Sequence, residues 1–490
     1  MTAALQPPNQ AAIPLGAQVR RAVVWRSGSQ IVAQSVQWAA TFLVIRLLAP
    51  ADYGLFAMTQ VVLLLLNMIN GYGLASALIR QPKVSPRQIR QLFGLLLAIN
   101  GGLAAAQWLL APLFAAYYRQ PEVAQLLRAQ VLLYLATPFV ALPQALLSRT
   151  LEFSRQAKVN IGASVLAAAT ALMGALAGWG VWTLVFAPIA LFAARGLGLT
   201  IAAGGLVRPS FDFRGTGAFL RYGGLVAAGQ MFALLWSQAD VFIAGRSFSP
   251  HLLGIYSTSL FLTQIFVSKI VPPLNEVAFA AYARLQTDRA AVGRAFLKLA
   301  RAVTALGMPF CFGLAATAEP LVLTVLGPHW AEAAPVVRLL ASSMPFYIVF
   351  VLLGPATDAL GRPGIATRNG AAAAVIAPAL LLVTVRAGVL GLAATWCLVF
   401  PALLAIGARR SLPVIGIGAR ALAAAVMPQV LAASAMAAVV VLLDHALPPI
   451  GPAARLMTLV AAGGAVYGLW LLAFARDVIG ELVALLGRRV

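Results

Sequence analysis

Charged residues are scarce in this chain of 490 residues. They make up 10% of it, whereas 61% is hydrophobic and the mean hydropathy is +0.91. Soluble globular domains are about one quarter charged, because charged groups cover their surface. The composition therefore excludes a soluble protein and predicts that lipid covers most of the molecule.

Side chains that bind metals or carry out catalysis are also few. The two cysteines, Cys311 and Cys397, lie in apolar runs, which argues against disulfides. The three histidines, His251, His329 and His445, are too scattered to predict a metal site. The chain lacks the G-x-x-x-x-G-K-[ST] motif for ATP and any outer loop long enough for a catalytic domain. We therefore expect a protein that is not an enzyme and has no cofactor.

Basic residues outnumber acidic ones, 35 to 13, which gives a net charge of +22. Such a charge could indicate a nucleic-acid partner. The basic residues instead form short clusters between apolar runs, where they fix the orientation of a protein in its membrane. We therefore expect membrane lipids as partners, and no nucleic acid.

Apolar runs long enough to cross a bilayer, about 20 residues each, occur about fourteen times. Proline and glycine mark many of their boundaries. The sequence thus predicts an all-α polytopic membrane protein. Its predicted spans are 28–48, 55–77, 91–116, 129–148, 159–178, 181–205, 218–242, 252–274, 300–318, 336–357, 367–385, 389–407, 421–443 and 455–474.

Lys and Arg are more frequent in every second loop, as the positive-inside rule requires, with both termini on the cytoplasmic side of the membrane. The predicted parts are a tail at 1–27, a six-helix lobe at 28–206, a linker at 207–217, a second six-helix lobe at 218–407, two helices at 408–475 and a tail at 476–490. The cytoplasmic loop at 276–299, between the eighth and ninth spans, carries a regularly spaced basic run. We expect a helix on the membrane surface there, built around Arg284, Arg289, Arg294, Lys298 and Arg301.

An internal repeat supports the two lobes. Residues 46–57 read RLLAPADYGLFA and residues 246–257 read RSFSPHLLGIYS, so Arg, Pro and Gly recur at an offset of 200. Further on, Pro138-Phe139 of the first copy resembles Pro345-Phe346 of the second copy. Both copies begin after a span that runs outward, so the six helices repeat in parallel orientation. In transporters, such repeats hold the substrate between the lobes, which rock to expose it on each side in turn.

Several segments resemble the polysaccharide-type flippases of the multidrug, oligosaccharidyl-lipid and polysaccharide exporter superfamily. They are LAPADYGLFA at 48–57, QADVFIAGR at 238–246, LGIYS at 253–257, VAFAAYARLQ at 277–286 and the stretch from Ala318 to Trp330. The resemblance covers most of residues 28–410. It implies a flippase of the bacterial inner membrane that moves an undecaprenyl-diphosphate-linked oligosaccharide to the periplasmic leaflet, for exopolysaccharide, capsule or O-antigen assembly. It also implies work alongside a polysaccharide polymerase and glycosyltransferases.

Charges within the spans are the candidates for substrate contact, because a charge in the bilayer costs at least a few kcal/mol. Lys269 and Arg195 lie inside predicted spans, while Arg46 and Arg246 occupy matching places near outer ends. Asp240 lies near Arg246 and is expected to neutralise a nearby Arg. A cationic cavity for the diphosphate is one interpretation. Snorkelling of long side chains to the headgroups is the other.

Nine tryptophans are present, and most are expected in an interfacial belt. Trp38 and Trp236 lie deeper, within the first and seventh spans, and are candidates for sugar contact.

Three other functions are compatible with a polytopic chain. A multidrug-type efflux carrier of the same superfamily is expected to have twelve spans and a more acidic cavity. A major-facilitator carrier is expected to have a Gly, Asp and Arg pattern that the loop at 80–87 lacks. A membrane polymerase or glycosyltransferase needs acidic residues in a long outer loop. Coupling of transport to Na+ or H+ is left open.

Overall fold

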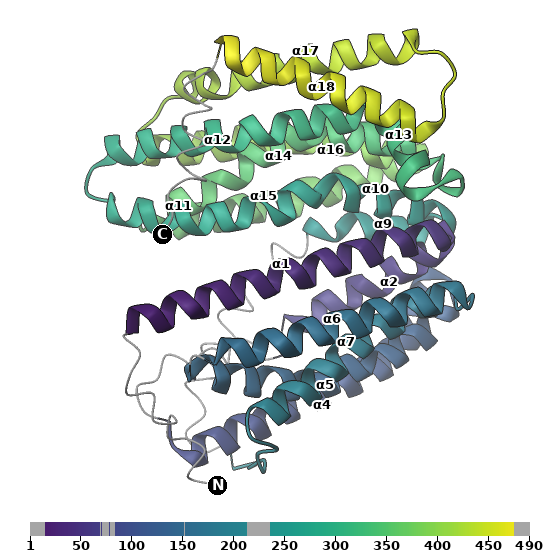
Figure 1. The fold of residues 1–490 in the computed structure, drawn as a ribbon, viewed down its shortest axis with the longest axis vertical. Coiled ribbons are helices and arrows are strands. Elements are labelled where there is room, and N and C mark those ends of the chain that lie inside the picture. Colours follow the sequence, from purple (N-terminus) through teal and green to yellow (C-terminus); the bar gives the residue numbers. More distant parts are fainter. Residues whose placement is uncertain are drawn as a thin grey trace. The chain divides into compact units, whose positions relative to one another are not determined.

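A computed structural model describes residues 15–68, 70, 78, 84–150, 152–212 and 236–474, and every regular element in these residues is a helix (Figure 1). The chain divides into two compact units, Met1–Leu234 and Leu235–Val490, called unit 1 and unit 2 below. The expected all-α fold is confirmed. Ten stretches of the described residues are long and apolar enough to cross a membrane, and two of them, Pro250–Arg284 and Pro363–Ile415, each contain two helices.

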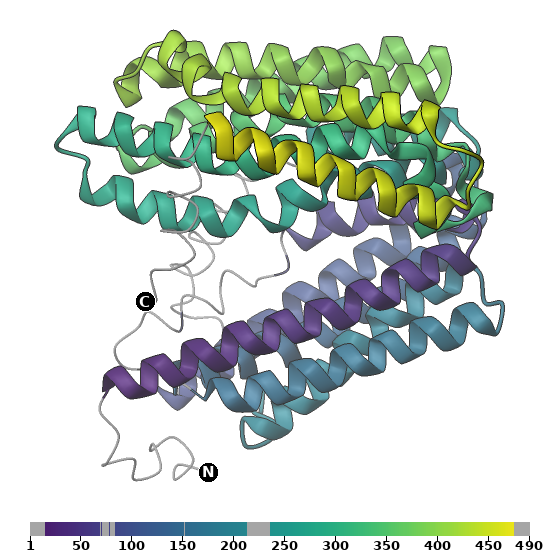
Figure 2. The same cartoon turned by 45° about the horizontal axis from the view of Figure 1, so that its top comes forward.

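Unit 1 is a bundle in which α6 packs against α1 and α7, and α5 packs against α4 and α7. The long α1 lies beside α6 in both views of the chain (Figures 1 and 2). The bounds are α1 Leu15–Leu47, α2 Pro50–Asn67, α4 Pro86–Tyr118, α5 Glu122–Arg149, α6 Phe153–Leu176 and α7 Val181–Ala202.

Unit 2 is built around α14, which packs against α10, α11, α12 and α16. The last two helices, α17 and α18, lie side by side along the unit, with α17 against α12 (Figure 2). The bounds are α9 Ala239–Ser247, α10 Pro250–Lys269, α11 Val271–Arg284, α12 Arg289–Ala316, α13 Ala318–Leu321, α14 Ala333–Ala359, α15 Pro363–Thr384, α16 Gly388–Ile415, α17 Ala419–Ala446 and α18 Pro452–Phe474. Short π and 3-10 turns follow α13 and α15.

Local sequence signals account for several helix starts. Pro50 and Pro250 stand at the first positions of α2 and α10, where a missing N–H does no harm. The Ser249 hydroxyl caps α10 by accepting from the Leu252 N–H, and Ser85 and Gln88 form a reciprocal capping box at α4. These two prolines belong to the repeat found in the sequence.

Helix pairing follows the same repeat. If α1, α2, α4, α5, α6 and α7 correspond in order to α9, α10, α12, α14, α15 and α16, then each main pair in unit 1 has a counterpart in unit 2. The pairs α1–α6, α4–α5, α5–α7 and α6–α7 match α9–α15, α12–α14, α14–α16 and α15–α16. The pairs α2–α5 and α2–α7 match α10–α14 and α10–α16. The arrangement is consistent with two copies of one six-helix unit.

All fourteen predicted spans overlap a helix of the structure, although 218–242 does so only at 239–242. The rest of 218–242 lies mostly outside the described residues, as does the end of the span at 55–77. The surface helix expected around Arg284 to Arg301 is wrong. Residues from Arg289 onward belong to α12 itself, and only 285–288 separate it from α11. The basic spacing there is the periodicity of a spanning helix that extends beyond its apolar part.

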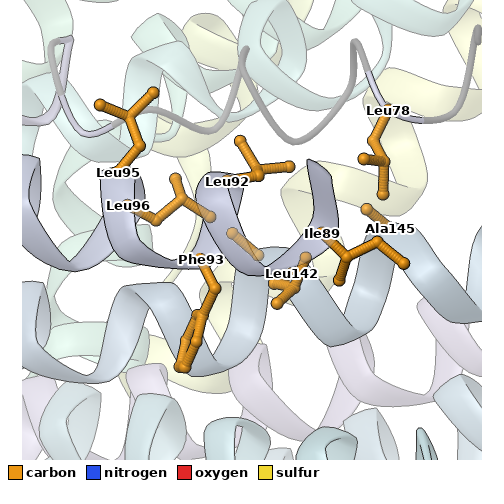
Figure 3. Packing of buried hydrophobic residues seen from close by; sticks show 9 residues of the cluster. Leu78, Ile89, Leu92, Phe93, Leu95, Leu96, Leu142 and Ala145 are labelled. Atoms are coloured by element: carbon orange, nitrogen blue, oxygen red, sulfur yellow. The ribbon is translucent and has the colours of Figure 1, made fainter. Parts of the chain in front are cut away.

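One apolar cluster in the core of unit 1 lies between α4 and α5 (Figure 3). Leu92, Phe93 and Leu96 of α4 pack against Leu142 and Ala145 of α5. These side chains are almost fully buried, so burial of their apolar area stabilises the pair by about 1.5–3 kcal/mol for each large side chain.

The segment after α7 is tied to α4. The Ser210 N–H donates to the Arg90 carbonyl at 2.9 Å, the Gln91 amide donates to the Asp212 carbonyl at 2.8 Å, and Arg87 pairs with the Asp212 carboxylate at 2.6 Å. Gly94 permits this approach, since a Cβ there would lie 2.1 Å from the Ser210 carbonyl oxygen. Residues 207–212 of the predicted linker are thus held on unit 1.

Candidate functional site

A buried carboxylate lies within unit 2. Asp240, in the first turn of α9, and Tyr256, in α10, are both fully buried. The Tyr256 hydroxyl donates to Asp240 Oδ2 at 2.7 Å, and the Val241 N–H donates to Asp240 Oδ1 at 2.7 Å. The Trp396 indole N–H of α16 in turn donates to the Tyr256 oxygen at 2.7 Å. These three side chains, Asp240, Tyr256 and Trp396, form a hydrogen-bond relay. Their deep burial is tolerated because each polar atom of the relay has a partner.

The expectation that Asp240 neutralises a nearby Arg is wrong. Both of its oxygens are engaged by uncharged donors, and Arg246 lies exposed in the last turn of α9. The two residues are six positions apart, which turns their side chains toward different faces of the helix. Asp240 therefore has a role inside unit 2 rather than on an accessible wall.

An aromatic cluster continues from the relay. It consists of Trp236, Tyr347, Trp396 and Phe400. Phe400 stacks between Tyr347 and Trp396, with ring centroids 4.7 Å from each. Trp236 meets Tyr347 and Trp396 edge-on, at 5.9 and 6.4 Å. Offset stacking and edge-to-face contacts are the favoured geometries of aromatic pairs.

The predicted cations differ in their surroundings. Arg195 of α7 is half-buried, and its Nε donates to Asn160 Oδ1 of α6 at 2.9 Å. Lys269 is exposed at the end of α10. Arg46 and Arg246 are both exposed in the last turns of α1 and α9, which is consistent with matching places in the repeat. These four do not form one cluster within either unit.

The remaining candidates are the two tryptophans. Trp38 is half-buried in α1, the helix that packs against α6. Trp236 is half-buried in the aromatic cluster of unit 2. The structure thus brings together two of the seven candidates, Asp240 and Trp236, through Trp396.

Sequence reasoning missed Tyr256, Tyr347, Trp396 and Phe400. One signal was available for Tyr256. At the offset of 200, Asp240 corresponds to Ala40 and Tyr256 to Phe56, so the second copy gains an acid and its hydroxyl partner together. Nothing in the linear sequence links Trp396 to this pair, because 140 residues separate it from Tyr256.

Comparison with known families shows a match over more than half of the chain. The sequence model of a family described as "Polysaccharide biosynthesis protein" matches residues 43–335.

Three curated relatives are similar. The teichuronic acid biosynthesis protein TuaB of Bacillus subtilis (strain 168) is 25% identical over 55% of this chain and 56% of its own length. The succinoglycan biosynthesis transport protein ExoT of Rhizobium meliloti (strain 1021) is 27% identical over 66% of each chain. The lipopolysaccharide biosynthesis protein WzxC of Escherichia coli (strain K12) is 23% identical over 60% of each. The matches therefore span less than two thirds of these relatives.

Solved structures share the fold. The lipid II flippase MurJ, in an inward closed conformation, aligns with a TM-score of 0.72 over 92% of this chain and 99% of its own, at 13% identity. An inward-facing multidrug resistance MATE family transporter of the MOP superfamily aligns with a TM-score of 0.57 over 81% of this chain and all of its own, at 14% identity. At such identities the likeness concerns the fold alone.

Proposed function

The chain belongs to the polysaccharide biosynthesis protein family, and from that membership we propose that it is a flippase for a lipid-linked oligosaccharide. The substrate we propose is an undecaprenyl-diphosphate-linked oligosaccharide. It moves from the cytoplasmic to the periplasmic leaflet of the inner membrane, where it feeds exopolysaccharide, capsule or O-antigen assembly.

The family match over residues 43–335 carries this proposal. Relatives whose names assign them to teichuronic acid, succinoglycan and lipopolysaccharide biosynthesis support it, and one of those names includes transport. The fold supports transport rather than catalysis, since its neighbours with solved structures are a flippase and a transporter. Two units of matching helix pairing suit alternating access, in which the units move as bodies.

The diphosphate sets the main energetic problem of this reaction. An unpaired charge in the bilayer costs several kcal/mol, so the path needs cations. Lys269 and Arg195 are our candidates. Lys269 is exposed, and Arg195 is half-buried and oriented by the hydrogen bond from its Nε to Asn160. Arg46 and Arg246 would act nearer the outer side, and both termini would lie in the cytoplasm.

Efflux of cationic small molecules is the alternative. A carrier of that kind needs an acid that its cargo can reach. Asp240 does not meet this need, because it is fully buried and both of its oxygens already accept hydrogen bonds. The polysaccharide function is therefore favoured.

The test is polymer export from cells in which this chain replaces its deleted gene. We expect Lys269→Ala and Arg195→Ala each to reduce export at unchanged membrane levels of the protein. Lys269→Gln should behave as Lys269→Ala does, and Lys269→Arg should retain more activity because it keeps the charge. Asn160→Ala breaks the same hydrogen bond as Arg195→Ala but keeps the cation, so its loss should be smaller.

The control for charge in general is Arg420→Ala, which removes an exposed cation from the first turn of α17. It should leave export unchanged. Normal export from the Lys269→Ala/Arg195→Ala double mutant would remove both residues from the substrate path. Export that does not depend on the chain at all would overturn the proposed function.

A further inference from the structure

The buried side of the aromatic cluster in unit 2, called its back below, has a fixed geometry. Trp396 and Phe400 are 3% and 1% exposed. Trp396 cannot rotate freely, because its indole N–H is bound to Tyr256, which is itself bound to Asp240. The relay therefore fixes the plane of Trp396, and Phe400 stacks on that plane.

The opposite side of the same cluster, formed by Trp236 and Tyr347 and called its front below, is partly exposed. Trp236 and Tyr347 are half-buried and rest against the fixed rings. Among the residues that the structure describes, neither the Trp236 indole N–H nor the Tyr347 hydroxyl has a hydrogen-bond partner. The front thus offers two aromatic rings in edge-to-face contact, and each ring carries a donor that no described residue engages.

These donors lie far from the membrane interfaces. Tyr347 comes 14 residues after Ala333 and 12 before Ala359, so it is about 20 Å from either end of α14 at 1.5 Å per residue. Aromatic residues of the interfacial belt lie near helix ends instead. A donor left unpaired at this depth is unfavourable, so the front requires a polar partner that reaches it inside the protein.

The chemistry of the front selects among ligands. A pyranose ring offers a flat face of C–H groups to stack on an aromatic ring, and its hydroxyls accept from indole N–H and phenol O–H groups. An acyl chain would cover the rings but leave both donors unpaired. A cationic drug can stack on aromatic rings, but its ammonium group accepts no hydrogen bond, so it too would leave both donors unpaired.

We propose that Trp236 and Tyr347 form a sugar-binding surface for the saccharide portion of the transported lipid, with Asp240 and Tyr256 acting as positioning residues behind it. This inference rests on the proposed function. It separates two tasks within the substrate, because the cations handle the diphosphate and this surface handles the sugar. Unit 1 has no equivalent relay, since Ala40 and Phe56 stand where unit 2 has Asp240 and Tyr256.

Binding of two ligands to the purified full chain tests this division. The ligands are the lipid-linked oligosaccharide extracted from the producing cells and undecaprenyl diphosphate without sugar, each titrated calorimetrically in nanodiscs. We expect Trp236→Ala to weaken binding of the oligosaccharide form about fivefold or more and to leave binding of the sugar-free form unchanged. Lys269→Ala should weaken binding of both.

Conservative variants keep the test decisive if Trp236→Ala does not fold. Trp236→Phe and Tyr347→Phe retain a ring but lack the donor, and each should weaken only the oligosaccharide form, by about threefold or more. The matched control is Trp182→Ala, which removes a tryptophan stacked on Phe186 in the first turn of α7 in unit 1. Trp182→Ala should leave both affinities unchanged.

The outcomes separate the two proposals. Equal losses for both ligands, or no loss for either, from the Trp236 and Tyr347 variants would overturn the sugar-binding surface while the flippase function stands. A wild-type chain that binds neither lipid would overturn the proposed function itself.

Discussion

Replacing Tyr256 by Phe removes one oxygen atom and leaves two buried groups without a partner. The Trp396 N–H loses its acceptor and Asp240 Oδ2 loses its donor, both at 2.7 Å. A buried neutral group without a partner costs about 1–3 kcal/mol, and a charged one costs more. We therefore expect Tyr256→Phe to destabilise the protein by about 3–6 kcal/mol.

Two other buried tyrosines provide matched controls. Tyr467 of α18 donates to the Ala305 carbonyl of α12 at 2.8 Å, so Tyr467→Phe removes one neutral bond and should cost about 0.5–1.5 kcal/mol. The Tyr282 hydroxyl of α11 is buried and has no partner among the described residues. Tyr282→Phe should therefore be neutral or slightly stabilising, since the hydroxyl is desolvated without compensation.

The assay can use the two thiols of the chain. Cys311 is 1% exposed and free, and Cys397 is half-buried, so Cys397→Ala leaves one thiol that reacts with a fluorogenic dye only on unfolding. Heating the three variants in this background should give apparent Tm values that fall in the order Tyr282→Phe, Tyr467→Phe, Tyr256→Phe. A Tyr256→Phe protein as stable as the Tyr467→Phe protein would show that the relay is not closed as described.

Two further predictions concern the joints of the helices. Gly94→Ala should displace residues 207–212 from α4, because the added Cβ would lie 2.1 Å from the Ser210 carbonyl oxygen. Trypsin should then cleave after Arg208 faster than in the wild type. The control is Gly101→Ala, whose Cβ would meet nothing within 4 Å and which should leave the cleavage rate unchanged. Asp444→Asn should lower the apparent Tm, because Arg455 of α18 loses a bidentate partner on α17, at a cost of about 1–3 kcal/mol. Asp212→Asn breaks the more exposed pair with Arg87 and should have little effect on Tm, and an equal fall in both would contradict the role given to burial.

The fold class could be predicted because the bilayer imposes simple requirements on sequence. A spanning helix needs about 20 apolar residues and internal satisfaction of its backbone, so composition and breaker residues suffice to count spans. Pro50 and Pro250 also gave the repeat, since each begins a helix at the same place in its unit. Helix ends that extend beyond the apolar runs were harder to predict from the sequence. Residues 289–298 carry basic groups, yet they continue α12, because helix formation does not end at the membrane surface.

The site was predictable only in part. Charge within an apolar run identifies a residue that needs a partner, and this singled out Asp240 correctly as unusual. Sequence proximity then suggested Arg246 as a partner, whereas α10 and α16 supply Tyr256 and Trp396. Partners in a helical bundle come from neighbouring helices, and the order of neighbours depends on packing that linear distance does not report.

The two copies of the repeat satisfy their buried polar groups differently, and this difference indicates how unit 2 became specialised. Among the described residues, the fully buried polar side chains of unit 1 are neutral, as where Gln130 donates to Thr59 at 3.0 Å and Gln107 donates to the Leu127 carbonyl at 2.7 Å. Unit 2 instead contains a carboxylate. An acid introduced alone at position 240 would be strongly destabilising, because burying an unpaired charge costs several kcal/mol. It is tolerable only with a donor at position 256, and the same hydroxyl then becomes an acceptor for Trp396. The acid, the hydroxyl and the indole therefore depend on one another and must change together. The property that they add is a fixed orientation of the aromatic rings.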